Sequence, residues 1–183
     1  MKKIVITFGL ISGAISSAMM FGTLPLMNRG ILNFKNGEIL GYTSMFLSFL
    51  LIFFGVRAYR ENIGGGTISY RRGLGVGLLI MVISCLCYVV SWEIIYFNVA
   101  PDFGEKYAAY AIDQMRAKGA TPAAIEAKRQ EMAKFKEMYD NPLINAAITF
   151  LEPLPIGLIV AFVSAGILRR KPTARPAAAT ALA

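Results

Sequence analysis

The sequence predicts an all-α integral membrane protein: a bundle of four transmembrane helices with a helical hairpin between the third and the fourth. Of its 183 residues, 56% are hydrophobic, whereas a soluble domain usually has about 45–50%. Four apolar runs of 18 to 26 residues account for the excess, and roughly 20 helical residues cross a hydrocarbon core of about 30 Å. A soluble core is the poorer interpretation, because so short a chain cannot cover four such helices with polar layers.

The four predicted spans contain no lysine or arginine, and their only acidic residues are Glu93 and Glu152. They cover residues 4–27, 39–56, 74–97 and 143–168.

The first span follows Met1-Lys2-Lys3, as the apolar core of a secretory signal peptide does, and Ser16-Ser17-Ala18 would serve as a cleavage site. Its apolar residues continue to Leu26, however, which is too long for a signal peptide. We therefore expect an uncleaved membrane anchor.

Small residues recur at four-residue spacing in the first and the fourth span. This spacing lets neighbouring helices approach closely in lipid. We expect the small residues to serve helix packing, within one bundle or between copies, although glycine and alanine are also common in membrane helices generally. They are Gly9, Gly13, Ser17, Gly157, Ala161 and Ala165.

Between the third and fourth spans lies the one sizeable polar segment, residues 102–140. Its Phe103, Tyr107 and Tyr110 share a helical stripe, and Thr121-Pro122 is typical of a helix start, with threonine as N-cap and proline in the first turn. We expect a helical hairpin standing on the membrane face, or two helices lying along it.

The C-terminal segment 172–183 consists almost entirely of alanine, proline and threonine. Such a composition favours disorder, so the predicted membrane domain is residues 1–171.

Basic residues concentrate on one predicted face of the membrane. If both chain ends and residues 57–73 share that face, it holds ten basic residues and a single acid, Glu61, and carries the whole excess behind the net charge of +8. This positive-inside pattern places both termini in the cytoplasm and residues 98–142 outside. It also explains the basic charge without nucleic acid as a partner. The ten are Lys2, Lys3, Arg57, Arg60, Arg71, Arg72, Arg169, Arg170, Lys171 and Arg175.

The two acids of the spans lie about 31 Å (Glu93) and about 25 Å (Glu152) along a helix from the nearest basic flank, which places both near the outer interface. Trp92 beside Glu93 fits an outer aromatic belt. Pro153 and Pro155 cannot donate backbone hydrogen bonds, so the fourth span is kinked there, or begins anew after a separate segment 143–152.

Irregular backbone at membrane depth is tolerated only against protein or a water-filled cavity. We therefore expect a polar vestibule lined by Glu93, Glu152, Trp92 and the carbonyls that Pro153 and Pro155 leave free. Two facing carboxylates would favour a shared proton or a cation, which is the chemistry of a transporter or channel. Alternatively, both acids reach interfacial water, or pair with Arg29 or Lys106 as a structural clamp.

Enzymatic function is not expected, because the sequence has no histidine and no phosphate-binding loop. Cys85 and Cys87 are two residues apart in one helix, so they point to different faces and cannot easily share a metal or a bridge. We expect no metal and no cofactor.

Several short motifs follow one another in an order that resembles a known family. They include Phe8-Gly9-Leu10-Ile11-Ser12-Gly13, Gly37-Glu38, Tyr88-Val89, Trp92-Glu93, Pro101-Asp102-Phe103, Asn141-Pro142 and the stretch from Glu152-Pro153 to Gly157. The family is one of small bacterial inner-membrane proteins known as a domain of unknown function, number 4199 of that series. The resemblance extends to about Lys171. It implies a four-helix protein of the bacterial inner membrane and supplies no activity and no catalytic residues.

Two classes of function remain. We expect a non-enzymatic, multi-pass membrane protein that acts by association through the small-residue stripes or the hairpin, with the lipid bilayer and a second copy or another membrane protein as partners. The alternative is a small transporter or ion-handling protein that uses Glu93 and Glu152.

Overall fold

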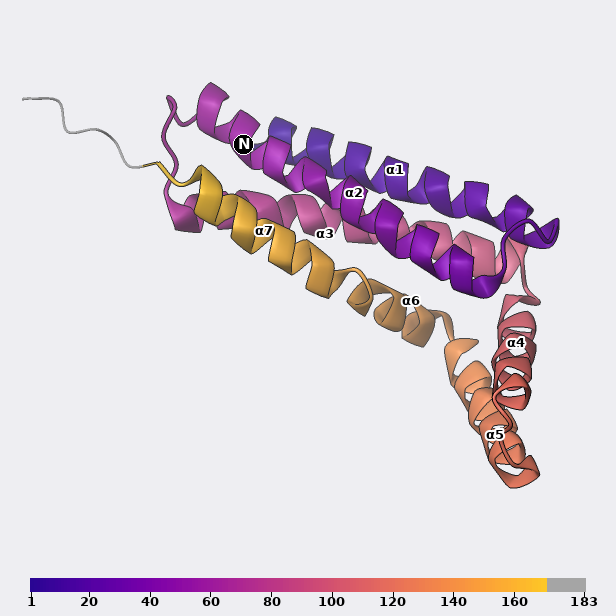
Figure 1. Cartoon of the computed structure of the whole chain (residues 1–183). Helices are drawn as coiled ribbons and strands as arrows, with labels where there is room; N and C mark the ends of the chain where they lie inside the picture. The colour runs from indigo at the N-terminus through magenta and orange to yellow at the C-terminus, as the bar shows by residue number, and fades with distance from the viewer. Residues whose placement is uncertain (171–183) are drawn as a thin grey trace, which may run out of the picture.

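The long helices of the four apolar segments lie side by side, and α4 (Phe103–Ala117) and α5 (Pro122–Tyr139) project from one end of them (Figure 1). The computed structural model describes residues 1–170, so the predicted disordered tail, with Lys171 and Arg175, lies outside the described residues. The elements in chain order are α1 (Lys2–Asn28), α2 (Phe34–Asn62), α3 (Tyr70–Ile94), the π-helical turn η1 (Ile95–Val99), α4 (Phe103–Ala117), α5 (Pro122–Tyr139), α6 (Pro142–Leu151) and α7 (Leu154–Leu168).

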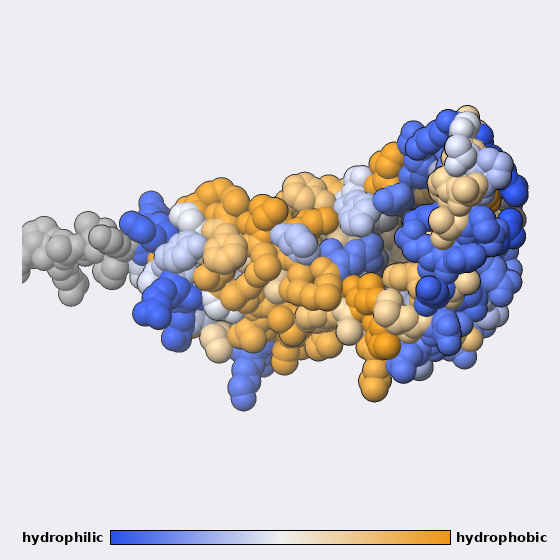
Figure 2. Space-filling model, turned by 90° about the horizontal axis from the view of Figure 1, so that it is seen from below, coloured by the Kyte–Doolittle hydropathy of each residue, from blue (hydrophilic) through white to orange (hydrophobic). Residues whose placement is uncertain are grey.

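Four segments are long and apolar enough to cross a membrane: Lys2–Met27, Phe34–Asn62, Tyr70–Val99 and Pro142–Leu168. Large apolar side chains along them are exposed, as lipid-facing residues would be, and Figure 2 shows a hydrophobic band between two hydrophilic ends. The predicted all-α bundle with four membrane-spanning helices is therefore confirmed.

The helices extend beyond the apolar runs that predict them. α2 begins at Phe34, where the Asn33 side chain accepts a 2.8 Å hydrogen bond from the Asn36 amide. α3 begins at Tyr70, where the hydroxyl of Ser69 accepts from the Arg72 amide at 3.4 Å. An apolar run marks the part of a helix that suits lipid, whereas the capping residue decides where the helix starts.

Polar side chains join the helices inside the bundle. The hydroxyl of Ser12 donates to the Ser48 carbonyl at 2.9 Å, and that of Ser16 to the Ser48 hydroxyl at 2.7 Å, which ties α1 to α2. The hydroxyl of Ser84 donates to the Gly9 carbonyl at 3.1 Å and ties α3 to α1. Short hydroxyl side chains suit this use because they let the backbones approach closely.

Both small-residue stripes lie against α3 of the same chain. A Cβ atom on Gly13 would lie 2.5 Å from that of Cys87, and one on Gly157 would lie 2.6 Å from Cγ of Met81, so glycine is required for either approach. Ser17 accepts a 2.7 Å hydrogen bond from Ser91. Ala161 and Ala165 are fully buried.

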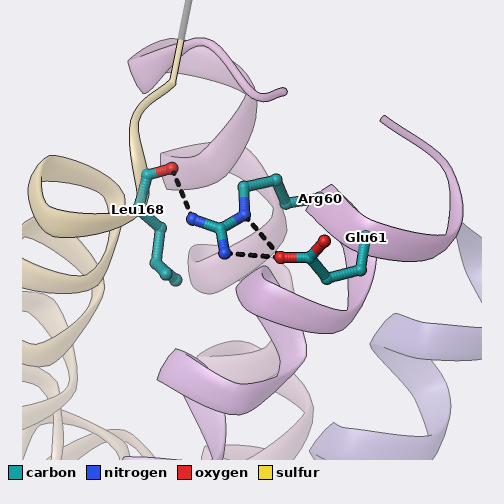
Figure 3. Close-up of polar contacts among 3 residues, drawn as sticks. All are labelled: Arg60, Glu61 and Leu168. Atoms are coloured by element: carbon teal, nitrogen blue, oxygen red, sulfur yellow. Dashed lines mark hydrogen bonds and ion pairs between the residues drawn. The ribbon is translucent and has the colours of Figure 1, made fainter. Parts of the chain in front are cut away.

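Arg60 joins helices at the end of the bundle where the described chain begins and ends (Figures 1 and 3). One guanidinium nitrogen donates to the Leu168 carbonyl at 3.4 Å, while two others donate to one carboxylate oxygen of Glu61. A cation suits this position because the last carbonyls of a helix carry partial negative charge. The contact thus fixes the end of α7 against α2.

α4 and α5 pack on each other at the opposite end. The chain turns between them at Gly119, whose φ of +75° favours glycine, and α5 starts with the Thr121 hydroxyl accepting from the Ala124 amide at 3.3 Å. An aromatic stripe on α4 packs on Phe34, the first residue of α2. The ring centroids of Phe103, Tyr107 and Tyr110 lie 5.6, 5.7 and 5.2 Å from that of Phe34.

Candidate functional site

A cavity of about 440 Å³ lies where the bundle meets α4 and α5. Small-molecule sites usually enclose about 300–1,000 Å³, so the cavity has the size of one. Its lining residues come from α1, α2, α3 and η1 of the bundle, from α4 and α5, and from α6 and the break that follows it. Figure 2 shows the surface hollowed between the hydrophobic band and the hydrophilic end formed by α4 and α5.

Its walls are mostly apolar and aromatic. The flexible thioethers of Met19, Met20, Met27, Met45 and Met132 line it, and methionine adapts readily to the shape of a bound molecule. On the α3 side, the rings of Tyr88, Trp92 and Tyr96 stand one helical turn apart. Such a wall favours an apolar or amphipathic ligand with a few polar contacts.

Glu152 faces this cavity from the break in the fourth span. The Tyr88 hydroxyl donates to one of its carboxylate oxygens at 3.1 Å. The Tyr42 hydroxyl lies beside the same carboxylate, and the rest of the side chain is accessible from the open cavity. Within residues 1–170 it has no basic partner: Lys106 pairs instead with Asp102 at 2.7 Å, and no ion pair forms with Arg29.

A second carboxylate, Glu38, lines the cavity from α2, one helical turn before Tyr42. It too forms no ion pair within the described residues. The one lysine of the cavity wall, Lys136, is already engaged with Asp140 at 2.8 Å. Among residues 1–170, no group of three or more metal-ligating side chains is arranged to hold a metal ion. The charge of this mostly apolar and aromatic wall is therefore negative.

A chain of hydrogen bonds attaches α5 and α6 to α3 beside the cavity. The Trp92 indole N–H donates to the Tyr139 hydroxyl at 2.9 Å, which lies 3.1 Å from the Thr149 hydroxyl. Thr149 in turn donates to the side-chain oxygen of Asn145, whose amide donates to the Tyr139 carbonyl. Burial raises the pKa of the Tyr139 phenol, so it stays protonated and can donate to Thr149. Each side chain in this series of hydrogen bonds thus has a partner.

A second link lies one turn beyond Trp92, in η1. The Tyr96 hydroxyl donates to Asp140 at 2.8 Å, and the Lys136 ammonium donates to the other carboxylate oxygen at 2.8 Å. The hydrogen bonds from Lys136 and from Tyr96 hold the pKa of Asp140 below its ordinary value. The same contact raises the pKa of Lys136. Tyr96 belongs to η1, and π-helical turns are frequent at functional sites.

Glu93 does not line the cavity, so the structure separates the two carboxylates that the sequence places in one vestibule. Tyr88, Trp92 and Tyr96 occupy one face of the helix, and Glu93, one residue beyond Trp92, is rotated about 100° away from it. One of its carboxylate oxygens is covered and has no hydrogen-bond partner within residues 1–170.

The two prolines interrupt the fourth span between α6 and α7. α6 ends at Leu151, and α7 begins at Leu154. Pro153 is fully buried at the break and accepts a 3.0 Å hydrogen bond from the Gly157 amide. Pro153 and Pro155 do not themselves line the cavity; they set the break that turns Glu152 toward it.

Of the predicted site residues, Trp92 and Glu152 line the cavity. Sequence reasoning missed Glu38, Tyr42 and Tyr139, which the fold brings to them. The sequence did contain a pattern that predicts the aromatic wall of the cavity: the aromatic residues at 88, 92 and 96 have the four-residue spacing of a single helix face.

The family described as "Protein of unknown function (DUF4199)" matches residues 7–170 of the chain. No curated protein and no solved structure matches it.

Proposed function

Because the chain belongs to the DUF4199 family and contains four helices able to cross a membrane, we propose that it is a non-enzymatic, multi-pass protein of the bacterial inner membrane that binds a small amphipathic molecule. The cavity of about 440 Å³ carries this proposal, because it combines an apolar wall with two carboxylates that have no basic partner among residues 1–170. The bilayer is then both the solvent of the protein and the source of a partly lipid-soluble ligand.

Charge supports a cytoplasmic location for both termini. The bundle end at which the described chain begins and ends carries Lys2, Lys3 and Arg57 together with Arg60, Arg71, Arg72, Arg169 and Arg170. Basic flanks of membrane spans remain in the cytoplasm. The cavity, at the opposite end, then faces the outer leaflet and the space beyond it.

Binding of a ligand is better supported than association through the small-residue stripes. Gly9, Gly13, Gly157 and their neighbours already pack against α3 of the same chain, so they are not free to contact a second copy. A further copy or another membrane protein would have to use other surfaces of the bundle or of α4 and α5.

Proton or cation transport is a second candidate function, favoured by the unpaired carboxylate of Glu152 at membrane depth. Transport needs a path through the other half of the bundle, which is filled by buried side chains such as Phe49, Ile52 and Ile80. If the protein transports, Glu152→Gln abolishes flux in reconstituted vesicles, and Glu93→Gln leaves it unchanged. Absence of flux through the parent protein removes this candidate.

A pair of glycine variants tests binding in the cavity. Gly41 lines the cavity, and a Cβ atom there would meet nothing within 4 Å, so Gly41→Phe fills the cavity without displacing the backbone. Gly22 is equally open but lies outside the cavity, and Gly22→Phe is the matched control. Energy transfer from Trp92, the single tryptophan, to the neutral fluorophore phenylnaphthylamine reports occupancy in nanodiscs. We expect Gly41→Phe alone to reduce the transfer; equal transfer in all three proteins contradicts the proposal.

A further inference from the structure

The cavity wall has the charge pattern of a receptor for a positively charged molecule. The charged side chains that line it within residues 1–170 are Glu38, Glu152 and Lys136. Lys136 is neutralised by Asp140, whereas neither glutamate has a basic partner among the described residues. The cavity therefore presents two carboxylates that nothing in the described chain balances.

Position makes an unbalanced carboxylate costly. Glu152 lies within the segment Pro142–Leu168, which is apolar enough to span a membrane. A charge at this depth needs a partner or water, and the partners of this carboxylate within residues 1–170 are neutral: the Tyr88 hydroxyl, which donates at 3.1 Å, and the Tyr42 hydroxyl beside it. A ligand that brought a positive charge would supply the missing partner, and the attraction would be stronger than in bulk water.

Aromatic rings surround the same carboxylate. Tyr88 contacts it directly, and Tyr42 and Trp92 line the cavity with it. The negative faces of such rings attract cations that carry apolar substituents, and quaternary ammonium groups are recognised in this way. An inorganic ion would gain little from the methionine-rich remainder of the wall.

We propose that the cavity binds a lipophilic organic cation, with the positive centre between Glu152 and Glu38 and the apolar part among the methionine and aromatic side chains. This inference rests on the proposed ligand-binding function and adds the chemical class of the ligand to it.

Two ions of the same shape and opposite charge test it. Tetraphenylphosphonium is the cationic probe and tetraphenylborate the anionic one, and each is titrated against the parent protein in nanodiscs with Trp92 emission as the readout. We expect saturable binding of tetraphenylphosphonium that Gly41→Phe removes and Gly22→Phe keeps. Glu152→Gln should weaken it about tenfold or more, as loss of a charge partner does once the ligand excludes water from the pair, and Glu38→Gln should weaken it less.

Glu93→Gln is the control for charge alone, because it removes a carboxylate from the same end of the bundle outside the cavity. Equal loss of affinity in Glu93→Gln and Glu152→Gln would overturn the inference. The inference would also be overturned if both ions bound with equal affinity and Gly41→Phe abolished the binding of each. In that case the cavity would still bind ligands, but without selecting for positive charge. If Gly41→Phe affects neither of these ions nor phenylnaphthylamine, the proposed function fails as well. Glu38→Gln, on an exposed side chain, keeps the test decisive should Glu152→Gln fail to fold.

Discussion

The indole N–H of Trp92 donates a 2.9 Å hydrogen bond to the hydroxyl of Tyr139. These residues belong to α3 and to the last turn of α5, so the bond joins the bundle to the projecting helices. It also lies in the cavity wall, to which both side chains contribute. This pair therefore contributes both to the attachment of α5 and to the shape of the cavity.

Removing the Tyr139 hydroxyl should loosen this attachment. Tyr139→Phe leaves the Trp92 N–H without its acceptor and interrupts the contact with Thr149; because both contacts are only partly buried, we expect a cost of about 1 kcal/mol, at the lower end of the range for buried polar groups. We expect faster hydrogen exchange in residues 136–150 and a shift in Trp92 emission. Tyr110→Phe is the control, because the Tyr110 hydroxyl has no hydrogen bond to the described residues. Equal exchange in the two variants would contradict the assignment.

The close approach of α1 to α3 predicts a strong effect at Gly13. Gly13→Leu forces a side chain into space that the Cβ and sulfur of Cys87 occupy, and overpacking of this kind destabilises by about 1–3 kcal/mol. Thermal unfolding in detergent measures the loss. Gly22→Leu places the same side chain on the same helix in open space and should leave the unfolding temperature nearly unchanged; an equal drop would show that the close contact with Cys87 is not responsible.

The contact between Lys136 and Asp140 predicts that the attachment of α5 to the bundle weakens in acid. Because hydrogen bonds from Lys136 and from Tyr96 lower the pKa of Asp140 in the folded protein, the carboxylate stabilises the attachment of α5 fully above its ordinary pKa of about 3.9. That stabilisation is lost as the pH falls through the lower folded value. Trp92 emission followed from neutral pH downward should change below about pH 4.

Asp140→Asn should abolish this acid transition, whereas Asp113→Asn, which alters an exposed pair with Arg116, should keep it. A transition that persists in Asp140→Asn would assign it to another carboxyl group.

Reporter fusions test the proposed orientation. Alkaline phosphatase is active only outside the cytoplasm, so a fusion after Ala120, between α4 and α5, should be active. A fusion after Gly65, between α2 and α3, should be inactive. A fluorescent protein that matures in the cytoplasm should give the reverse pattern. The opposite result would place the cavity on the cytoplasmic side.

The sequence was sufficient for the four spans because lipid imposes one simple requirement, a long apolar run. It was less informative about the ends of the helices. α2 continues from Val56 to Asn62 through polar residues, and helical hydrogen bonds do not depend on an apolar side chain. Caps such as Asn33 and Ser69 decide these ends locally.

The candidate site was only partly predictable for a different reason. Counting residues gives the depth of Glu93 and Glu152 in the membrane, because the rise per residue is constant. It does not give their rotation about the helix axis, which depends on which face of α3 packs on its neighbours. The contributions of Lys136 and Tyr139 follow from the docking of α5, which no local pattern encodes.

The break at Glu152 and Pro153 divides the fourth crossing into two separate hydrogen-bond ladders. α7 alone, with 15 residues, is about 22 Å long, shorter than a hydrocarbon core of about 30 Å, so α6 must complete the crossing. Fraying that starts in one ladder stops at the prolines instead of passing into the other. Pulled from a handle on α5, the chain should release α6 in a first step of extension and α7 in a later one, as two mechanical units within a single span.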